Sequence, residues 1–378
     1  MSTELPGTLF DHFSVIEDSR DERKRRHLLI DAIVIAIAAV LCGADGWTEI
    51  EEFGKAKEGW FRRFLELPFG IPSHDTLGRI FAVLSPEVFE ACFREWVASV
   101  RAVCGEDVIA IDGKSLRRSH NRKKGLGPLH MVSAWSTANG LVLAQQATEA
   151  KSNEITAIPK VLEMLELKGC IVTIDAMGCQ KTIAEQIVER GGDYVLALKG
   201  NQSKLAEAVE ELFTDADAAD YAGWPMDFHE TTERGHGRVE TRRYWTLTAV
   251  EKIPQASEWA KLNTIGMVQC ERQVDGKTTT ESRFYIASTG GDAGRFAWAV
   301  RSHWGIENGL HWCLDIAFRE DESRVRDRQA ANNLAVMRHI ALGLLKKDTT
   351  IKRGIKTKRL VAGWDEDYLA KLLFEQGA

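Results

Sequence analysis

The 378-residue chain lacks the cysteine patterns of metal-binding ribbons and of small secreted proteins. Its seven cysteines stand singly, and no two of them have C-x-x-C spacing. That absence argues against a zinc ribbon and a disulfide framework, and it favours a reducing intracellular compartment, the cytoplasm. The N-terminus has no apolar core of a cleavable signal peptide. The most apolar run, residues 32–44, is shorter than the ~20 residues of a membrane helix and is expected to be a buried core helix.

An excess of positive charge is also absent. The chain carries 49 Lys and Arg against 55 Asp and Glu, which gives a formal net charge of −6. The overall balance therefore does not indicate a polyanionic partner, and any such partner must bind local basic patches. With 44% hydrophobic and 28% charged residues, the composition is that of a globular protein, and the length predicts two or three domains.

Residues 1–100 are predicted to form a helical region. Apolar positions recur at helical spacing in three stretches, 28–42, 47–67 and 77–99. Ser73 or Asp75 is placed to cap the helix that follows.

From about residue 105 the pattern changes to a mixture of strands and helices. The predicted order is strands at 107–112, 129–136 and 140–148, a helix at 153–167, a strand at 170–175, a helix at 180–190 and a strand at 193–199. This order predicts an α/β domain with a mixed central sheet and flanking helices. We interpret the β-rich segment 225–290 as an insertion into that domain. Helical spacing returns at 292–318 and 328–346, and a basic segment, 346–359, precedes a last short helix.

Two of the predicted strands end in an acidic residue. Asp112 follows Ile109-Ala110-Ile111, and Asp175 follows a similar apolar run. Because ligands bind beyond the carboxyl ends of strands in an open sheet, these two carboxylates are candidates for one site. A strand-terminal Asp is also a common turn residue or helix cap, and that alternative stays open.

A third acidic residue is expected from the segment 292–318. On an ideal helix, one stripe would contain His303, Glu307, His311 and Asp315. A solvated polar face is the simpler interpretation. Two histidines eight residues apart lie roughly 12 Å apart along a helix and cannot share a zinc ion. Three converging carboxylates suit Mg²⁺ or Mn²⁺, and two such ions can promote phosphodiester displacement.

Basic and polar residues surround the candidate acids in the sequence. They are Lys114, Arg117 and Arg118 after the first strand, Lys199, Asn201 and Gln202 after the strand at 193–199, and Arg234, His236, Arg238, Arg242 and Arg243 in a hairpin-like segment. Such residues could hold the phosphates of a polyanionic substrate near an acidic centre. Each group alone is equally typical of a solvated loop, an ordinary turn or an exposed ribbon.

Several motifs, taken in order, resemble one protein family. They are AIDGKSLRRS, TIDAMGCQ, YVLALKGNQ, ERGHGRVETRR and RSHWGIENGLHWCLDIAFRED, with GIPSHDTLGR in the helical region. This combination resembles the H-repeat-associated insertion-sequence transposases of bacteria, which are DDE transposases with a ribonuclease H-like catalytic domain. The resemblance covers nearly the whole chain.

The resemblance implies a DNA-cutting and DNA-joining enzyme. Asp112, Asp175 and Glu307 match the three catalytic acids and would hold two Mg²⁺ ions, with Mn²⁺ as a substitute. Water would cut a phosphodiester at the element's end, and the freed 3′-hydroxyl would attack target DNA. The superfamily's Arg and Lys positions around the Glu are His303 and Leu314 here. The roles of His303, Asn308 and His311 in DNA binding therefore stay open, as does Asp315 as a rival to Glu307.

The same resemblance sets the expected partners and domains. The partner would be double-stranded DNA, as transposon ends and target, with a homodimer in the synaptic complex and no membrane; the protein would be cytoplasmic, and nucleoid-associated when bound to DNA. We expect a helical N-terminal domain at 1–100 for end recognition, a catalytic domain at 101–345 and a basic C-terminal segment at 346–378. Two alternatives stay open: a catalytically idle DNA-binding relic, and a nuclease of the same fold that never joins DNA.

Overall fold

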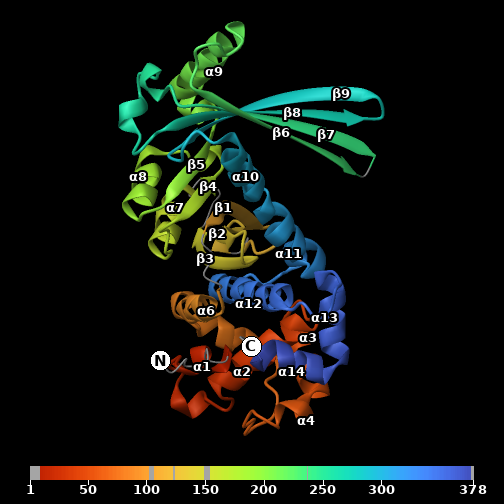
Figure 1. Cartoon of the computed structure of the whole chain (residues 1–378). Helices are drawn as coiled ribbons and strands as arrows, with labels where there is room; N and C mark the ends of the chain where they lie inside the picture. Colours follow the sequence, from red (N-terminus) through yellow and green to blue (C-terminus); the bar gives the residue numbers. More distant parts are fainter. Residues whose placement is uncertain (1–8, 102–105, 122–123, 149–153, 236, 376–378) are drawn as a thin grey trace, which may run out of the picture. The chain divides into compact units, whose positions relative to one another are not determined.

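The apolar run 32–44 lies mostly in a helix whose side chains are almost all buried. This helix is α2, Leu29–Leu41, in a computed structural model that describes residues 9–101, 106–121, 124–148, 154–235 and 237–375 (Figure 1). The prediction of a buried core helix is confirmed. Among the described residues, none of the helices combines the length and the apolar character that a membrane crossing requires.

Chain contacts divide the structure into two units. The first unit comprises Met1–Val103, Gly113–Asn153 and Glu307–Ala378, and the second comprises Cys104–Asp112 and Glu154–Ile306. Each unit is thus assembled from segments that are far apart in the sequence. The predicted division at residues 100 and 345 stays a prediction.

The first unit is mainly helical. Its helices are α1 (Leu9–Ser14), α2, α3 (Trp47–Ala56), α4 (Glu58–Phe61), α5 (His74–Val83), α6 (Pro86–Val100), α11 (Trp312–Ala317), α12 (Arg328–Lys347), α13 (Ile355–Trp364) and α14 (Glu366–Phe374). The strands β2 (Leu129–Ser136) and β3 (Leu141–Thr148) form an antiparallel hairpin in the same unit. The long helix α12 packs against α2, α5, α6 and β3, so C-terminal sequence completes the core of the N-terminal helices.

The N-terminal helices are shorter than the sequence pattern predicts. The stretch 77–99 is divided between α5 and α6, because Pro86 has no N–H for a helix interior and instead occupies the first turn of α6. The Ser85 hydroxyl accepts a hydrogen bond from the N–H of Val88 at 3.4 Å. Ser73 caps α5 in the same way through the N–H of Thr76, as predicted.

The second unit is built on a mixed sheet. Its strands are β1 (Asp107–Leu116, whose last four residues belong to the first unit), β4 (Cys170–Ile174), β5 (Asp193–Leu198), β6 (Met226–Gly235), β7 (Arg238–Leu247), β8 (Thr264–Val274) and β9 (Lys277–Ala287). The order in this unit is β1-β4-β5-β9-β8-β7-β6. The pairs β1–β4 and β4–β5 are parallel, and the later pairs are antiparallel. The predicted mixed α/β class is confirmed.

The segment interpreted as an insertion continues this sheet. Strand β9 pairs with β5, with Leu196 opposite Ile286, so the two long hairpins extend the sheet beyond its parallel part (Figure 1). The sequence pattern shows that this segment is β-rich, but it does not show how the strands pair.

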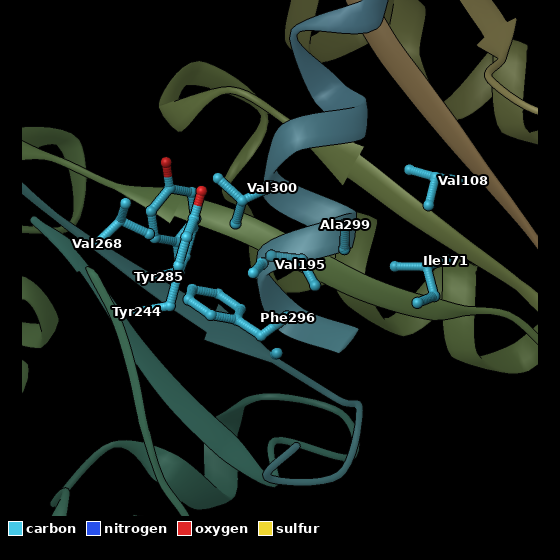
Figure 2. Packing of buried hydrophobic residues seen from close by; sticks show 11 residues of the cluster. Val108, Ile171, Val195, Tyr244, Val268, Tyr285, Phe296, Ala299 and Val300 are labelled. Atoms are coloured by element: carbon cyan, nitrogen blue, oxygen red, sulfur yellow. The ribbon is translucent and has the colours of Figure 1, made fainter. Parts of the chain in front are cut away.

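Within the described residues, four α-helices accompany the sheet of the second unit. They are α7 (Glu154–Glu163), α8 (Lys181–Glu189), α9 (Ser203–Ala218) and α10 (Ala293–His303). Helix α10 packs on β4, β5, β6 and β7. Figure 2 shows the core beneath it, where Phe296 of α10 lies edge-on to Tyr244 of β7 and Tyr285 of β9.

The predicted helix at 292–318 is not a single ideal helix. Helix α10 ends at His303, Glu307–His311 form a π-helical turn, and α11 follows. Gly305 and Gly309 weaken regular helix here, and a Cβ at Gly309 would come within 2.9 Å of the Trp135 ring. The prediction of one regular helix with four polar residues in a stripe is therefore wrong, although Glu307 and His311 still contact each other.

Candidate active site

The two candidate acids stand next to each other in the sheet. In the parallel pair β1–β4, Ile111 is opposite Ile174, so Asp112 and Asp175 follow directly where this pairing stops. Strand β4 ends there, but β1 continues to Leu116, so the predicted strand end at Asp112 is wrong. Both are among the residues that line a cavity of about 240 Å³ in the second unit, together with Lys199, Arg283 and His303. The structure thus brings together two of the three predicted catalytic acids.

The carboxylate of Asp175 is held by the backbone that follows it. Its Oδ1 accepts hydrogen bonds from the N–H of Met177 at 3.0 Å and of Gly178 at 3.4 Å, which caps a short 3₁₀ turn. A Cβ at Gly178 would lie 2.3 Å from the Ile174 side chain, so this turn requires glycine. Asp175 is therefore a cap as well as a cavity residue, and the two interpretations do not exclude each other.

The polar residues after β5 fasten the same turn. The side-chain amide of Asn201 donates to the carbonyl of Ala176, and that of Gln202 donates to the carbonyl of Cys179 at 3.0 Å. Lys199 is exposed at the cavity. The described contacts of Asn201 and Gln202 thus support the wall of the site, whereas Lys199 is accessible to a ligand.

Helix α10 contributes the opposite wall of the cavity. Nδ1 of His303 lies 3.1 Å from the Thr173 hydroxyl, which fixes the ring against β4. The adjacent Trp304 is 42% exposed, and the Arg283 guanidinium lies 5.1 Å from its ring centre. Arg283 comes from β9 and was not identified from the sequence. Only the cross-strand pairing of the ribbon reveals it.

The third predicted acid, Glu307, belongs to the first unit. Its side chain is 58% exposed, and one carboxylate oxygen lies 3.3 Å from Nδ1 of the buried His311. Asn308 is exposed beside it. His303 and His311 belong to different units and are not neighbours on one regular helix.

Lys114 lies in a cluster of carboxylates in the first unit. Its ammonium is 2.6 Å from Asp315, 2.8 Å from Glu320 and 3.6 Å from Asp321, and its side chain is 13% exposed. Burial acts to lower the pKa of Lys114, but Glu320 and Asp315 outweigh it and the pKa rises. The rival acid Asp315 is thus an ion-pair partner of Lys114, and the predicted phosphate contact of Lys114 has an internal alternative.

The other predicted basic residues differ in exposure. The Arg117 side chain is 77% exposed and pairs with Asp321 at 3.0 Å, and Arg118 is exposed. Arg238 is 43% exposed at the start of β7. His236 lies outside the described residues. In the basic C-terminal segment, Arg359 is buried and donates to the Val40 carbonyl at 2.7 Å, so part of that segment is structural.

Comparisons with known proteins cover almost the whole chain. A family model described as "Transposase DDE domain" matches residues 104–344, and one described as "DDE_Tnp_1-associated" matches residues 10–97. The H repeat-associated putative transposase YhhI of Escherichia coli K12 is 39% identical over 98% of both chains. The putative transposase YncI of Escherichia coli O157:H7 is 41% identical over 97% of this chain and 94% of its own.

A solved piggyBac transposase synaptic complex with hairpin DNA is similar at a TM-score of 0.43 and 8% identity, covering 96% of this chain and 75% of that one. A likeness at that level supports no argument about this chain. The match of the family model and the mixed sheet agree with the ribonuclease H-like class expected from the motifs. The chain therefore belongs to the family of transposases that carry this DDE domain, with H-repeat-associated transposases among its relatives.

Proposed function

We propose that the protein cuts DNA at the ends of an insertion sequence and joins those ends to target DNA by two-metal-ion phosphodiester displacement. The observation that carries the proposal is the pair of carboxylates, Asp112 and Asp175, which lie where the parallel pairing of β1 and β4 stops, in one cavity that Lys199 and Arg283 also line. Family membership supports the same reaction.

The residues at the cavity fit a hard divalent cation. Asp112 and Asp175 offer carboxylate oxygens, the ligands that Mg²⁺ prefers, and backbone N–H groups already orient the Asp175 carboxylate. We propose that Asp112, Asp175 and Glu307 hold two Mg²⁺ ions, with Mn²⁺ as a substitute. When bound, such ions activate water and stabilise the leaving oxygen.

The chain's own cations would position the substrate. Lys199 and Arg283 would bind phosphates beside the scissile bond, while the contact between His303 and Thr173 keeps the α10 wall in place. No covalent link between protein and DNA is required. For the remaining predicted contacts, Arg117, Arg118 and Asn308 are exposed and fit a role in DNA binding, and residues 1–100 would recognise the ends.

The Asp175→Asn variant tests the proposal. We expect loss of Mg²⁺-dependent cleavage of a duplex carrying an element end, with duplex affinity little changed, because the amide removes a metal ligand without adding bulk. Asp217→Asn on the exposed side of α9 makes the same charge change away from the cavity and should cleave normally. Because Asp175 also caps a turn, thermal unfolding of both variants checks the fold.

Three other results would contradict the proposal or favour one of its alternatives. Undiminished cleavage by Asp175→Asn would refute the assignment of the acid. Wild-type protein that binds DNA in a salt-dependent way but never cleaves it would favour the idle relic. Products that end at hydrolysis, with no joined strand, would favour the nuclease.

A further inference from the structure

The two hairpins β6–β7 and β8–β9 form a ribbon whose two faces differ. Residues that are opposite each other on neighbouring strands form a row across the ribbon; Arg238 and Val274 share one row, and Arg234 and Val239 share the next. Because successive side chains of a strand alternate, neighbouring rows point to opposite faces of the ribbon. One face carries Tyr244 and Tyr285, which pack on Phe296 of α10 (Figure 2). We name it the cavity face, because Tyr285 and Arg283 on it line the cavity with Asp112 and Asp175. The other is the outer face, where Phe284 packs on Phe213 of α9.

The two faces of the ribbon also differ in charge. We compare the described residues of the ribbon from the rows of His229 and Phe228 to the hairpin ends. In this region the charged residues of the cavity face are the basic Arg238, Arg242, Arg272, Lys277 and Arg283 and the acidic Glu233, Glu240 and Glu281. Over the same described rows the outer face carries Arg234 and Arg243 against Glu230 and Glu271. Arg243 pairs with both acids of its face, at 2.8 and 3.4 Å. The cavity face is therefore positive, and the outer face is balanced.

A nearly buried carboxylate organises the arginines of the cavity face. Glu240 is 10% exposed and lies between Arg238 at 3.3 Å, Arg272 at 3.6 Å and Arg242. Arg242 also pairs with Glu233 at 2.9 Å, so two carboxylates face three guanidinium groups, and the side chains of Arg238 and Arg272 remain 43% and 49% exposed. The arrangement thus holds cations in place while leaving positive charge available to an anion.

The positive face is continuous with the candidate active site. Along β9, Arg283 at the cavity and Lys277 at the ribbon's end lie on the same face, six residues or about 20 Å apart. Arg301 of α10 adds a cation beside this face, 3.5 Å from Glu233. A duplex carries one phosphate charge per roughly 1.7 Å of its axis, so a track of this length can follow about half a helical turn.

We propose that the cavity face of the ribbon binds the phosphate backbone of the duplex that flanks the scissile bond, with Arg272 and Lys277 as contacts distant from the cavity. The proposal rests on the proposed function, and it assigns the substrate to one face of the ribbon. The outer face, by its balanced charge, makes no comparable contact. Arg234 and Arg243 belong to the same hairpin as Arg238, but in this proposal they do not bind the duplex.

The test compares two double variants that remove the same positive charge. We expect Arg272→Ala with Lys277→Ala to weaken binding of a mixed-sequence duplex roughly 10- to 100-fold at about 0.1 M salt, and to reduce the slope of log affinity against log salt by about 1.8. Arg234→Ala with Arg243→Ala on the outer face should leave both quantities near the wild-type values. Arg272→Lys with Lys277→Arg keeps the charge and should restore the slope, and thermal unfolding checks the fold of each variant.

The outcomes separate this proposal from the proposed function. Wild-type protein without affinity for the duplex would overturn the proposed function. Suppose that the wild-type protein binds the duplex. If both double variants then lose the same affinity, or if the cavity-face variant loses none, only the assignment of the face is overturned. A cavity-face variant that loses self-association in sedimentation but keeps duplex affinity would assign the face to a second copy of the chain and overturn the proposal.

Discussion

Two buried glutamates, one in each unit, gather cations around them with different results. In the first unit, Glu320 is paired with Lys114 at 2.8 Å and Arg338 at 3.5 Å, and both of its partners are almost wholly buried. In the second unit, Glu240 is paired with Arg238, Arg242 and Arg272, two of which are almost half exposed. The first cluster is largely buried and joins parts of the chain that are distant in the sequence, whereas the second presents charge to solvent.

The difference shows why a basic residue in the sequence does not identify a ligand contact. The pKa of Glu320 is raised by burial, but Lys114 and Arg338 lower it more strongly, to about 2. Charges satisfied to this degree stabilise the fold and have little left for a phosphate. Around Glu240 the cations outnumber the carboxylate, and the surplus is available for binding.

The largest effect should come from breaking the closed cluster. We expect Glu320→Gln to lower the free energy of unfolding by about 3–5 kcal/mol at neutral pH, because it leaves Lys114 and Arg338 buried with one carboxylate fewer. Urea unfolding followed by circular dichroism measures it. Glu322→Gln, on an exposed side chain of the same short turn, should leave the free energy of unfolding close to the wild-type value.

The loss of unfolding free energy in Glu320→Gln should also depend on pH. The folded-state pKa of Glu320 lies below its ordinary value, so its stabilisation is complete above about pH 4.5 and declines as the pH falls towards 2. The difference between wild type and Glu320→Gln should shrink over that window. A difference that stays constant with pH would contradict an electrostatic role.

An intermediate effect is expected at Glu90, a buried carboxylate with one weak cation partner. Arg94 lies 3.5 Å away, and burial, with a smaller contribution from Glu87, raises the pKa of Glu90 to about 7. The folded protein therefore binds a proton that the unfolded chain releases, and stability declines as the pH rises from about 4.5 to 7. As the pH rises from 5 to 8, the free energy of unfolding of Glu90→Gln should therefore increase by about 2–3 kcal/mol relative to that of the wild type.

Parallel urea titrations at the two pH values measure this gain. Glu87→Gln, at an exposed position one turn earlier in α6, is the control and should show little change of the difference with pH. A Glu90→Gln variant that tracks the wild type at both pH values would show that the carboxyl is not held protonated.

The smallest effect should come from the open cluster. We expect Glu240→Gln to lower the free energy of unfolding by less than about 1 kcal/mol, because Arg238 and Arg272 can turn to water and Arg242 keeps Glu233 at 2.9 Å. The same chemical change thus compares the two clusters directly under identical urea unfolding conditions. A loss as large as that of Glu320→Gln would remove the distinction between closed and open clusters.

The sequence pattern predicted features that depend on local order. The end of β4 was found because its apolar run stops at Asp175, and the segment that contains β6–β9 was recognised as β-rich. The end of β1 was not found, because the strand continues past Asp112 to Leu116. The fold class followed from the order of these elements. Such signals lie within a few residues of each other and survive folding.

Features that depend on distant pairing could not be predicted. Glu320, the partner of Lys114, lies 206 residues away in the sequence, so nothing near Lys114 indicates that its charge is already paired. Arg272 and Arg283 join the cavity face only through the register of β8 and β9. The helix drawn through His303 and Glu307 assumed regular geometry, which the π-helical turn removes. The three-acid site itself stays a prediction.

Because α12 completes the core around α2, α5 and α6, synthesis order constrains how the first unit matures. The ribosome releases the N-terminal helices well before Arg328–Lys347 emerges, and at about 5–20 residues per second the interval is roughly 12–50 s. During that time α2 can pack on α1, α3 and α5, but the part of its surface that packs on α12 has no final partner. A nascent chain arrested before α12 should therefore be a chaperone client, and truncation of either terminus should leave the other without a core.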